Sequence, residues 1–498
     1  MTPENGLLPA IVLSSLLPGL VIFFLPEARV AVRTTLNLVG AVLKLLLVGV
    51  LMQEVLAGRV FENRWPLLPG IDLVLHADAL SVLFVTLSAV LWLVTTVYAI
   101  GYLEGSPGRS RFFGFFSLCV TATVGIALAG NLLTFLLFYE VLTLATYPLI
   151  VHRGTEQARR AGRVYLFYTL GGGALLLLGT VGLYRLTGTL EFMPEGFVGQ
   201  HAEAGKGVLS AVFVLLVTGL GVKAALVPLH GWLPQAMVAP APVSALLHAV
   251  AVVKAGAFGI VRVVHDVFGV AFSLSLGVTG PLALLAAVTI VYGSLRALYQ
   301  DDLKRRLAFS TVSQVAYITL GVALAGPVAT VGGLVHLVHQ GVMKITLFFC
   351  AGNLAETLGI HRVSEMHGVG RRMPWTMAAF TVAALGMIGA APLAGFVSKW
   401  HLGLGGLETG QAWVLWVLSA SSLLNMLYFL PILYVAWFRP PPPVWPQERR
   451  FGRRETALAL LFPPLFTALL TLLFGLLAGA PFSPLNWARL IAEREYVP

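Results

Sequence analysis

Apolar runs of about twenty residues recur along the whole chain and are separated by short polar segments. A helix needs roughly 20 mostly apolar residues to cross the hydrocarbon core of a bilayer. Since no long polar stretch divides these runs, the pattern predicts one all-α polytopic membrane protein and not soluble domains joined by linkers. We expect about 14 spans, near residues 6–25, 34–54, 78–101, 112–129, 132–151, 164–184, 208–229, 240–264, 272–294, 307–325, 327–353, 374–402, 411–438 and 456–480.

Two of the expected spans are interrupted by glycine and proline. They contain the segments "GVKAALVPLHGWLPQAMVAPAP" in span 7 and "LGMIGAAPLAGFVSKWHLG" in span 12. Proline removes a backbone donor and clashes with the preceding helical turn. In lipid, the freed backbone groups must be buried in protein or face a cavity. Both segments are therefore predicted to be broken helices, and paired interruptions of this kind are typical of transporters built from inverted repeats.

The two interrupted spans lie five spans apart, which predicts two inverted five-helix repeats. We expect spans 4–8 to form the first repeat at residues 111–265, and spans 9–13 to form the second at residues 266–440. Residues 1–110 are then the N-terminal transmembrane helices 1–3. Residues 441–498 are expected to hold a cytoplasmic loop, the last helix and a short tail.

The composition supports a lipid environment. The 498 residues are 58% hydrophobic and only 11% charged, whereas soluble proteins carry about 25% charged residues. The two cysteines, Cys119 and Cys350, are too few for a cysteine-ligated iron–sulfur cluster and form no disulfide framework. Since no motif for a nicotinamide, flavin, quinone or metal is recognisable, we expect no cofactor and no catalytic centre. The start of the chain lacks the basic region of a cleaved signal peptide, so the first apolar run is expected to be a retained span.

The net charge of +10 reports topology and not a nucleic-acid partner. Alternate loops hold 20 Lys and Arg residues on one side of the expected spans and 7 on the other, counted from the printed sequence. Cytoplasmic loops carry the excess of positive charge. The asymmetry therefore predicts a multi-pass protein of a bacterial or archaeal cytoplasmic membrane with both termini outside.

Five cations remain after the loops are counted, and all of them are lysines inside expected spans: Lys44, Lys223, Lys254, Lys344 and Lys399. A cation at the centre of a bilayer costs at least about 2.5–3.5 kcal/mol and normally faces the bundle interior or a wet cavity, where it marks an ion or proton path. A buried lysine can release its proton, whereas arginine stays charged. Lys44 has no ionisable neighbour in its span, so we expect its side chain to extend to the membrane interface.

One carboxylate and two histidines accompany these lysines. Glu140 lies in the middle of a span, where a carboxylate without a partner is unfavourable. The pattern does not identify its lysine and leaves open a structural ion-pair or capping role. His248 precedes Lys254 by six residues, about 9 Å along a helix, and His336 shares a helix face with Lys344. Because histidine titrates near neutrality, both are candidate proton carriers.

The other histidines of these spans carry weaker signals. His230 lies at a span end, where a helix cap and a relay are equally compatible with its position. His248, His336 and His339 lack the tight spacing with a third ligand that zinc requires. We therefore expect no metal site.

Four segments in order carry a resemblance: "VKAALVPLHGWLPQAMVAPAPVSALLHAVAVVKAG", "LKRRLAFSTVSQVAYITLG", "HQGVMKITLFFCAG" and "GFVSKWHLG". Together they resemble the proton-conducting antiporter-like family, over about residues 75–440. Its members are the large antiporter subunits of complex I, the corresponding subunits of membrane-bound hydrogenases, and Mrp-type cation/proton antiporter subunits. The segment "FYEVLTLATYPLIVHRGTEQARRAGRVYL" and a lysine at position 399 look most like the D subunit of Mrp antiporters.

The resemblance implies a proton relay in which Glu140 pairs with Lys223 on broken helix 7 and Lys399 on broken helix 12 is the last relay, near the opposite half-channel. The implied members are Glu140, Lys223, His248, Lys254, His336, Lys344 and Lys399. Further possible members are His230, His339 and Lys304.

Two of these positions depart from the family or carry an open role. The family has Asn-His before the lysine of helix 11, whereas this chain has His339-Gln340, a shift of one position or about 100° around a helix. Lys304 matches a lysine at the cytoplasmic end of a family helix, and a structural role for it stays open.

The function predicted from these features is proton translocation within a multisubunit Mrp-type monovalent cation (Na+)/proton antiporter. One alternative is a proton-pumping membrane-arm subunit of a complex I-like NADH:quinone oxidoreductase or a membrane-bound hydrogenase. Another is the energy-coupling subunit of a bicarbonate-uptake complex. The expected partners are other membrane subunits, protons, Na+ and the lipid bilayer, without nucleic acid. The sequence leaves open the coupling cation, the direction of transport and the parent complex.

Overall fold

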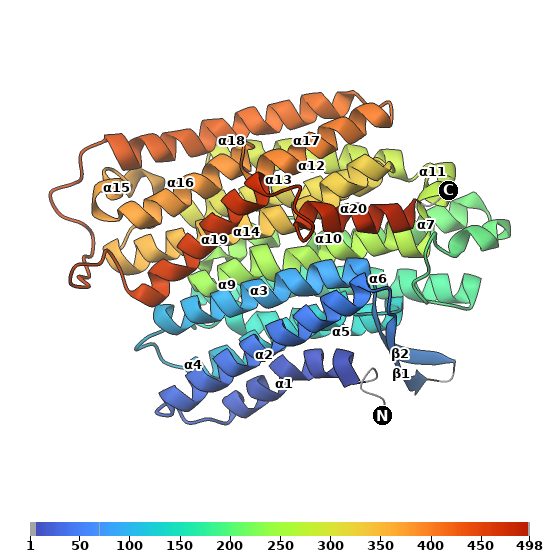
Figure 1. Ribbon diagram of the computed structural model, residues 1–498, viewed down its shortest axis with the longest axis horizontal. Coiled ribbons are helices and arrows are strands. Elements are labelled where there is room, and N and C mark those ends of the chain that lie inside the picture. Colours follow the sequence, from blue (N-terminus) through green and yellow to red (C-terminus); the bar gives the residue numbers. More distant parts are fainter. Residues whose placement is uncertain (1–5, 69, 497–498) are drawn as a thin grey trace.

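The structure is a computed structural model that describes residues 6–68 and 70–496. It is a bundle of helices that run side by side along the longest axis of the molecule (Figure 1). Each expected span coincides with a helix, or with helices on either side of a break. The prediction of an all-α polytopic membrane fold is therefore confirmed, with one small β-hairpin added.

The first half of the chain builds the lower part of the bundle in Figure 1. Its N-terminal elements are α1 (Leu7–Phe23), α2 (Val30–Leu56), β1 (Phe61–Leu68), β2 (Ile71–Ala77) and α3 (Ala79–Tyr102). The helices that follow are α4 (Arg109–Ala127), α5 (Leu132–Ile150), α6 (Glu156–Thr187), η2 (Val198–Ala204) and α7 (Lys206–Lys223). After the first break come α8 (Trp232–Gln235), η3 (Ala236–Val238), α9 (Ala241–Ala245), η4 (Leu246–Val250), α10 (Val252–Arg262) and η5 (Val263–Val267).

The helices of the second half also lie side by side along the long axis of the bundle (Figure 1). Its elements up to the second break are α11 (Val270–Leu276), α12 (Thr279–Leu298), α13 (Leu303–Ala323), α14 (Pro327–Leu358), η6 (Val363–Glu365), α15 (Val369–Arg372) and α16 (Pro374–Ile388). Beyond it lie α17 (Ala394–Glu408), α18 (Trp413–Phe438), α19 (Leu458–Leu476) and α20 (Pro484–Glu495).

Eleven helices of the described chain are long and apolar enough to cross a membrane. The expected spans that this criterion leaves out have identifiable causes. α1 and α16 are apolar but short, and α16 and α17 are the two halves of a broken span. α13 carries the polar sequence "LKRRLAFSTVSQ". The count of about 14 spans and the inverted repeats stay predictions.

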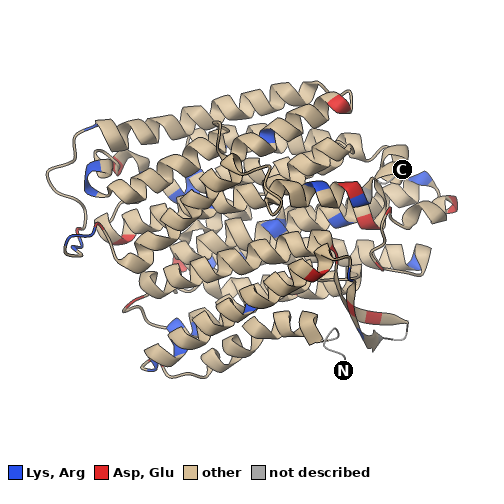
Figure 2. Ribbon diagram, viewed as in Figure 1, with Lys and Arg blue, Asp and Glu red and all other residues tan. Residues whose placement is uncertain are grey.

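The loops gather at two ends of the bundle, as the alternate-loop count requires. α1 begins and α20 ends at the right-hand end in Figure 1, beside the hairpin, and the loop between α18 and α19 lies at the left. The terminal residues themselves lie outside the described chain. Loops that share an end of the bundle are joined by hydrogen bonds. In one such pair Ser364 Oγ donates to Asp301 Oδ2 at 2.8 Å, and in another Arg64 Nη2 donates to Glu191 Oε2 at 3.0 Å. Figure 2 shows charged residues at both ends and few between them.

The hairpin of β1 and β2 was not expected from the apolar pattern, because its strands are too polar to read as a span. The strands pair antiparallel, with Phe61 opposite Ala77. β2 also bonds to the loop after α4: His76 N donates to Leu128 O at 2.7 Å, and Gly130 N donates to Val74 O at 2.9 Å. The hairpin thus covers the turn between α4 and α5.

Both expected breaks are present. α7 ends at Lys223, and the indole of Trp232 donates to the Val222 carbonyl at 2.8 Å, which satisfies one of the carbonyls freed at the helix end. α16 ends at Ile388 because Gly389 has a left-handed φ of 95°. Each break therefore leaves a helix C-terminus inside the bundle, where its carbonyls can accept hydrogen bonds.

Two boundaries differ from the expectation. The span expected near 272–294 begins at Thr279, because Gly277 stops α11 in a left-handed conformation. The short tail contains a helix, α20, which packs against α3 and α14. The indole of Trp487 on α20 donates to the Ala79 carbonyl at 2.7 Å. The sequence did not show this helix because only one of its faces is apolar.

Candidate functional site

The expected relay residues are carried by helices of the bundle interior. Lys223, Lys254 and Lys344 lie on α7, α10 and α14 and are fully buried. Lys399 lies on α17 and is partly exposed. The charges of Lys254 and Lys399 both act on His336 of α14, which lies between α10 and α17. The structure thus brings the expected lysines into one series across the bundle.

Each lysine of the series, together with its contacts, is called a station. The first station is Lys223, which joins α5 and α7. The Nζ atom of Lys223 donates a hydrogen bond to the Tyr139 carbonyl and lies 3.2 Å from the centroid of the Tyr139 ring. Glu140 follows directly in the chain, and its negative charge acts on Lys223. The Oε1 atom of Glu140 is buried without a hydrogen-bond partner, so it does not accept from Lys223. The two charges are therefore neighbours whose contact runs through the backbone of Tyr139.

Glycine makes room for this glutamate. The carboxylate of Glu140 packs directly against Gly173 of α6, where any Cβ would overlap Oε1. One residue earlier, Gly172 packs closely against Gly219 of α7. Small residues of this kind let membrane helices approach one another. The close contact of α6 with α7 holds Glu140 beside the end of the helix that carries Lys223.

The second station is linked to the first by α10. Gly256 of α10 packs against the backbone of Lys223 at the end of α7. Two residues earlier, Lys254 Nζ donates to the Leu337 carbonyl of α14 at 2.8 Å. α10 therefore connects the lysine at the first break with the central helix α14.

His248 belongs to the same region but not to the same regular helix. It lies in η4, a single wide π-helical turn, and its ring packs on Phe348 with centroids 4.5 Å apart. Both ring nitrogens are buried without a hydrogen-bond partner. Such wide turns are frequent at functional sites. A buried imidazole with two open nitrogens can accept and donate a proton through water.

The third station lies on α14. Lys344 Nζ donates to Ser310 Oγ of α13 at 2.8 Å, with the Leu307 carbonyl at 3.4 Å. His336, two turns earlier, bonds through Nδ1 to Ser398 Oγ of α17 at 2.9 Å. Its Nε2 atom is buried and unpaired. The residue that follows Ser398 is the lysine of the second break, so His336 connects α14 to that break.

The last station uses the break in span 12. Lys399 Nζ donates to the carbonyls of Met387 and Ile388, at 3.2 and 2.8 Å, and to Ser422 Oγ of α18 at 2.8 Å. These carbonyls end α16, where the helix dipole favours a cation. A cavity of about 370 Å³ adjoins Lys399 between α17 and α18, lined also by Trp400. Lys399 is therefore the member of the series that reaches the surface of the bundle.

No carboxylate in the described chain acts on Lys254, Lys344 or Lys399. Their hydrogen-bond acceptors are backbone carbonyls and serine hydroxyls. A buried ammonium without a counter-charge is costly. The ammonium groups of these lysines therefore depend on the carbonyl and hydroxyl acceptors around them.

The weaker candidates also have contacts of their own outside the series, although the charges of His339 and Lys304 act on His336 and His248. His230 packs edge-on against Tyr292, with centroids 5.0 Å apart. Lys304 donates to the Ala239 carbonyl at 2.5 Å, a structural contact at the end of the first break. His339 stacks on Phe474 of α19, so its ring faces away from the α13 side where Lys344 bonds.

Gln340, named above for its departure from the family pattern, and Gln314, which the sequence did not single out, are polar residues of this region. Both amides are buried, and neither the oxygen nor the nitrogen of either has a hydrogen-bond partner. The signal was available, since an uncharged amide in the middle of an apolar helix is uncommon. Unpaired buried amides indicate room for water beside the lysine series.

Lys44 does not extend to the membrane interface, and that expectation is wrong. Its side chain is fully buried and donates to Ser15 Oγ at 2.6 Å, with Nζ 5.0 Å from the centroid of the Trp92 ring. Ser15 in turn bonds to Thr121 of α4 at 2.8 Å. This contact joins α1, α2, α3 and α4, away from the stations on α7, α10, α14 and α17.

A buried charge cluster at the hairpin end was also missed. Arg262, counted among the loop cations, is only 2% exposed. Its guanidinium bonds to Asp78 at 2.6 and 3.0 Å and to Asp266 at 2.9 Å. A cavity of about 190 Å³ lies beside these side chains. The three residues are far apart or near span ends in sequence, so only the fold reveals their pairing.

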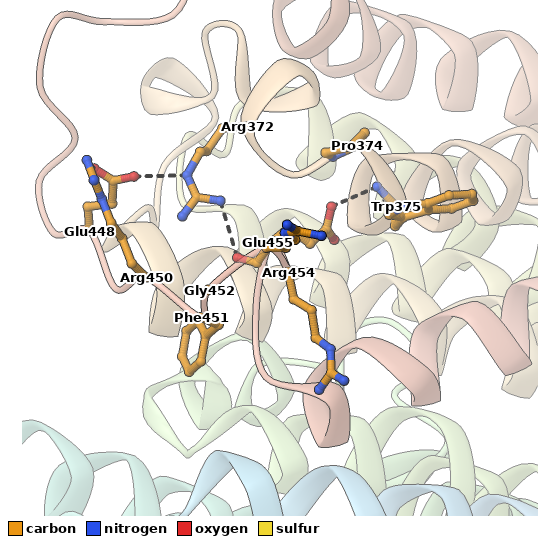
Figure 3. Close-up of a pocket in the computed structure, with 10 residues that line it drawn as sticks. Arg372, Pro374, Trp375, Glu448, Arg450, Phe451, Gly452, Arg454 and Glu455 are labelled. Atoms are coloured by element: carbon orange, nitrogen blue, oxygen red, sulfur yellow. Dashed lines mark hydrogen bonds and ion pairs between the residues drawn. The ribbon is translucent and has the colours of Figure 1, made fainter.

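A groove at the opposite end of the bundle is separate from the lysines. It has a volume of about 400 Å³, between α16 and the loop 439–457. Arg372 bonds there to Glu448, and the Glu455 carboxylate accepts from the backbone N–H of Trp375 at 2.9 Å (Figure 3). Glu455 thereby caps the start of α16. The groove holds the loop against the bundle, and no lysine of the series lines it.

Among the described residues, no group of three or more His, Cys, Asp or Glu side chains is arranged to hold a metal ion. Both cysteines are buried and far apart in the chain. What the arrangement offers chemically is a set of groups that can gain and lose protons.

Comparisons with known proteins agree with the resemblance found in the sequence. The family described as "NADH:quinone oxidoreductase/Mrp antiporter, TM" matches residues 129–425, and "NADH-Ubiquinone oxidoreductase (complex I), chain 5 N-terminus" matches residues 69–113. The N subunit of the NADH-quinone oxidoreductase of Desulforudis audaxviator is 38% identical over 430 residues, which cover 84% of each chain. The D subunit of the Na(+)/H(+) antiporter of Bacillus subtilis is 29% identical over 480 residues, 93% of this chain and 92% of the relative.

The fold is also known from solved structures. A chain of the Mrp complex from Dietzia sp. superposes with a TM-score of 0.87 over 100% of this chain and 98% of that chain, at 24% identity. At this identity the likeness establishes the fold.

Proposed function

Because the chain belongs to the NADH:quinone oxidoreductase/Mrp antiporter transmembrane family, we propose that it is a proton-translocating subunit of a Mrp-type monovalent cation (Na+)/proton antiporter. Its path consists of Glu140, Lys223, His248, Lys254, His336, Lys344 and Lys399. The observation that carries the proposal is a series of four lysines inside the bundle, three of which no carboxylate of the described chain approaches.

The first step depends on Glu140. While its carboxylate is charged and near, the ammonium of Lys223 is stabilised by that charge, by the Tyr139 carbonyl and by the Tyr139 ring. When Glu140 moves away or is neutralised, Lys223 loses its counter-charge in a medium of low dielectric constant and releases its proton. Coupling of this kind needs the two side chains close but not locked together, as they are here.

The proton then passes towards the centre of the bundle. Carbonyl acceptors cannot carry it, so the transfer from Lys223 to Lys254 runs through water. His248, whose two ring nitrogens are open and on which the charge of Lys344 acts, serves the next transfer, from Lys254 to Lys344. Arrival of a proton at Lys254 places a second positive charge near Lys344, on which it acts directly. Repulsion between the two favours onward release, and His336 provides a titratable group between Lys254 and Lys399.

The series ends at Lys399, whose cavity between α17 and α18 leads to the bundle surface. This is where a proton leaves or enters the second repeat. His339 and Lys304 stay possible members of the path, since the charge of His339 acts on His336 and that of Lys304 acts on His248, whereas His230 packs against Tyr292.

The antiporter assignment rests on the relative from Bacillus subtilis, which is named an antiporter subunit and matches almost end to end. A second candidate is a proton-pumping subunit in the membrane arm of a complex I-like oxidoreductase. It is favoured by the 38% identity to the N subunit of the NADH-quinone oxidoreductase of Desulforudis audaxviator. The lysine series serves either parent complex, since each moves protons across a membrane.

The remaining features follow from the same proposal. The chain spans a cytoplasmic membrane with both termini outside, supported by the 20-to-7 distribution of loop cations. Residues 111–265 and 266–440 form two inverted repeats, each with one of the breaks. Other membrane subunits are its partners, and Na+ is the counter-moving cation.

Purification of the native complex through a tag on this chain separates the two candidates. Small antiporter subunits among the co-purified proteins support the first, and quinone-module and iron–sulfur subunits support the second. The reconstituted antiporter is then tested for Na+-driven proton movement in vesicles. Lys223→Ala is expected to abolish it, and Lys206→Ala, at an exposed position of the same helix, is expected to leave it unchanged. Wild-type movement in Lys223→Ala contradicts the proposal.

A further inference from the structure

Lys344 and Lys399 are joined by an unbroken series of hydrogen bonds that passes through α18. Lys344 bonds to Ser310, whose Oγ is 2.9 Å from the Tyr428 hydroxyl. That hydroxyl is 2.6 Å from Asn425 Oδ1. Asn425 Nδ2 donates to the Met387 carbonyl at 2.8 Å, and the same carbonyl accepts from Lys399.

The two α18 side chains face the interior of the bundle, where Asn425 Oδ1 also lies 3.5 Å from Ser294 Oγ. Tyr428 and Asn425 are three residues apart, on one face of the helix, and are 1% and 0% exposed. The opposite face is apolar and open, with Leu423 and Leu427 57% and 53% exposed. A buried tyrosine and asparagine on an otherwise apolar helix are costly unless bonded, and here both are bonded to the two lysine stations.

We propose that Tyr428 and Asn425 are positioning residues that couple the charge of Lys344 to that of Lys399 through a reversible hydrogen-bond chain. The inference rests on the proposed function and names two residues outside its lysine–histidine path. The chain moves no net proton and breaks no covalent bond. Only the direction in which the hydroxyl hydrogens point is changed.

The direction follows from which atoms can donate. A charged Lys344 can only donate, so Ser310 accepts from it, and the engaged Ser310 oxygen is a weaker acceptor for the single hydroxyl hydrogen of Tyr428. Tyr428 then donates to Asn425 Oδ1. Hydrogen bonds in a chain polarise one another, so the amide of Asn425 becomes a stronger donor to the Met387 carbonyl. That carbonyl is then less available to Lys399, which favours the neutral form of Lys399.

The reverse holds when Lys344 is neutral. Its amine can accept the hydrogen of Ser310, and Ser310 accepts the hydrogen of Tyr428. Asn425 Oδ1 loses its short bond from Tyr428 and keeps only the long one from Ser294 at 3.5 Å, so its N–H bond to Met387 weakens and the carbonyl is released to the ammonium of Lys399. The two lysines therefore hold a proton alternately, which prevents both from being charged at once across a region of low dielectric constant.

The test compares Tyr428→Phe with Tyr434→Phe in the complete complex in vesicles. Tyr434 lies on the same helix and is 53% exposed. Tyr428→Phe removes only the hydroxyl, and we expect it to slow proton translocation by at least about tenfold and to displace the pH profile. Tyr434→Phe is expected to keep the wild-type rate and profile. A residue that only holds α18 in place would lower the amount of folded complex without displacing the profile, and that result overturns the inference.

Three further variants, at Ser310 and Lys344, test the same hydrogen-bond chain. If the complex with Tyr428→Phe does not assemble, the Ser310 variants replace it. Ser310→Ala removes the hydroxyl between Lys344 and Tyr428 and is expected to slow proton translocation. Ser310→Thr keeps a hydroxyl there and is expected to translocate protons normally. Lys344→Ala distinguishes a failure of the coupling from a failure of the proposed proton path. Loss of translocation in Lys344→Ala with a normal Tyr428→Phe overturns the coupling alone, whereas normal translocation in both overturns the proposed function as well.

Discussion

The carboxylate of Glu140 lies directly against Gly173 of the neighbouring helix α6, where a side chain of any size would overlap Oε1. This contact fixes where the only deep carboxylate of the expected path sits, next to the end of α7 and its Lys223. The position of Glu140 is thus determined by a residue that bears no charge and takes no part in proton transfer.

Gly173→Ala is expected to slow proton translocation by about tenfold or more without loss of the fold. The new methyl group pushes the flexible end of Glu140 away from Lys223, while the helix gains roughly 1 kcal/mol of propensity. Gly171→Ala is the matched control, since a Cβ there has open space. The assay is proton movement by the reconstituted complex. Equal rates in both variants contradict the assigned role of Glu140.

Arg262→Leu is expected to destabilise the protein by about 3–5 kcal/mol, because it leaves the buried Asp266 and its neighbour Asp78 without their cation. Arg163→Leu breaks the pair with Glu156, in which both side chains are about 70% exposed, and such pairs contribute less than about 1 kcal/mol. Thermal unfolding in detergent measures both. A similar melting temperature for the two variants would show that the Arg262 cluster is not a structural pair.

The carboxylate of Glu27 makes a pH-dependent contribution to the free energy of unfolding. Its carboxylate caps α4 by accepting from the backbone N–H of Ser110 at 2.9 Å and of Arg109 at 3.1 Å. Partial burial opposes this, but the two backbone hydrogen bonds and the nearby cations Arg33 and Arg109 lower the pKa of the Glu27 carboxyl. A lowered folded pKa stabilises above the unfolded value, about 4.3, and this contribution is lost as pH falls through the folded value.

Glu27→Gln is therefore expected to melt below the wild type at neutral pH, with a difference that shrinks below about pH 4. Glu203→Gln, at a side chain 75% exposed, is the control and is expected to melt as the wild type does. A Glu27→Gln difference that is constant from neutral to acidic pH would mean that the carboxylate charge does not contribute to the cap.

Lys44→Met tests whether every buried lysine carries protons. Lys44 contacts Ser15 and Trp92, and none of its contacts leads to α7, α10, α14 or α17. Replacing a buried charge by an apolar side chain of similar volume is often neutral or stabilising. We expect normal translocation and an unchanged or higher melting temperature. Loss of translocation at normal expression would place Lys44 in the path.

The sequence was sufficient for the architecture and for locating most of the buried lysines. Apolar run length located the helices, and Gly/Pro interruptions located the breaks beside Lys223 and Lys399, because lipid penalises unpaired backbone and buried charge strongly. For Lys44 the same penalty led to the wrong expectation that its side chain extends to the membrane interface. Inside the bundle a hydroxyl and an aromatic ring stabilise its ammonium. Whether a buried cation stays inside depends on partners from other helices, which spacing along one helix does not show.

The residue roles that the sequence did not reveal have one physical cause in common. Tyr428, Asn425 and Gly173 are ordinary residues in a membrane helix, and their roles arise only from contacts with α13, α16 and α5. For the shifted His339, the fold shows both a ring stacked on Phe474 and a charge that acts on His336, so its relay role stays a prediction. Tertiary contacts, not residue type, separate these cases.

The central claim is that protons move along the buried series that begins at Glu140, and the most direct measurement is proton translocation by the reconstituted complex carrying Glu140→Gln. The substitution removes the charge and keeps the shape that Gly173 accommodates. Glu156→Gln, whose side chain is 74% exposed, is the control. The account predicts a loss of at least about tenfold for Glu140→Gln alone. Wild-type translocation by Glu140→Gln, in vesicles that contain the same amount of assembled complex, would contradict it.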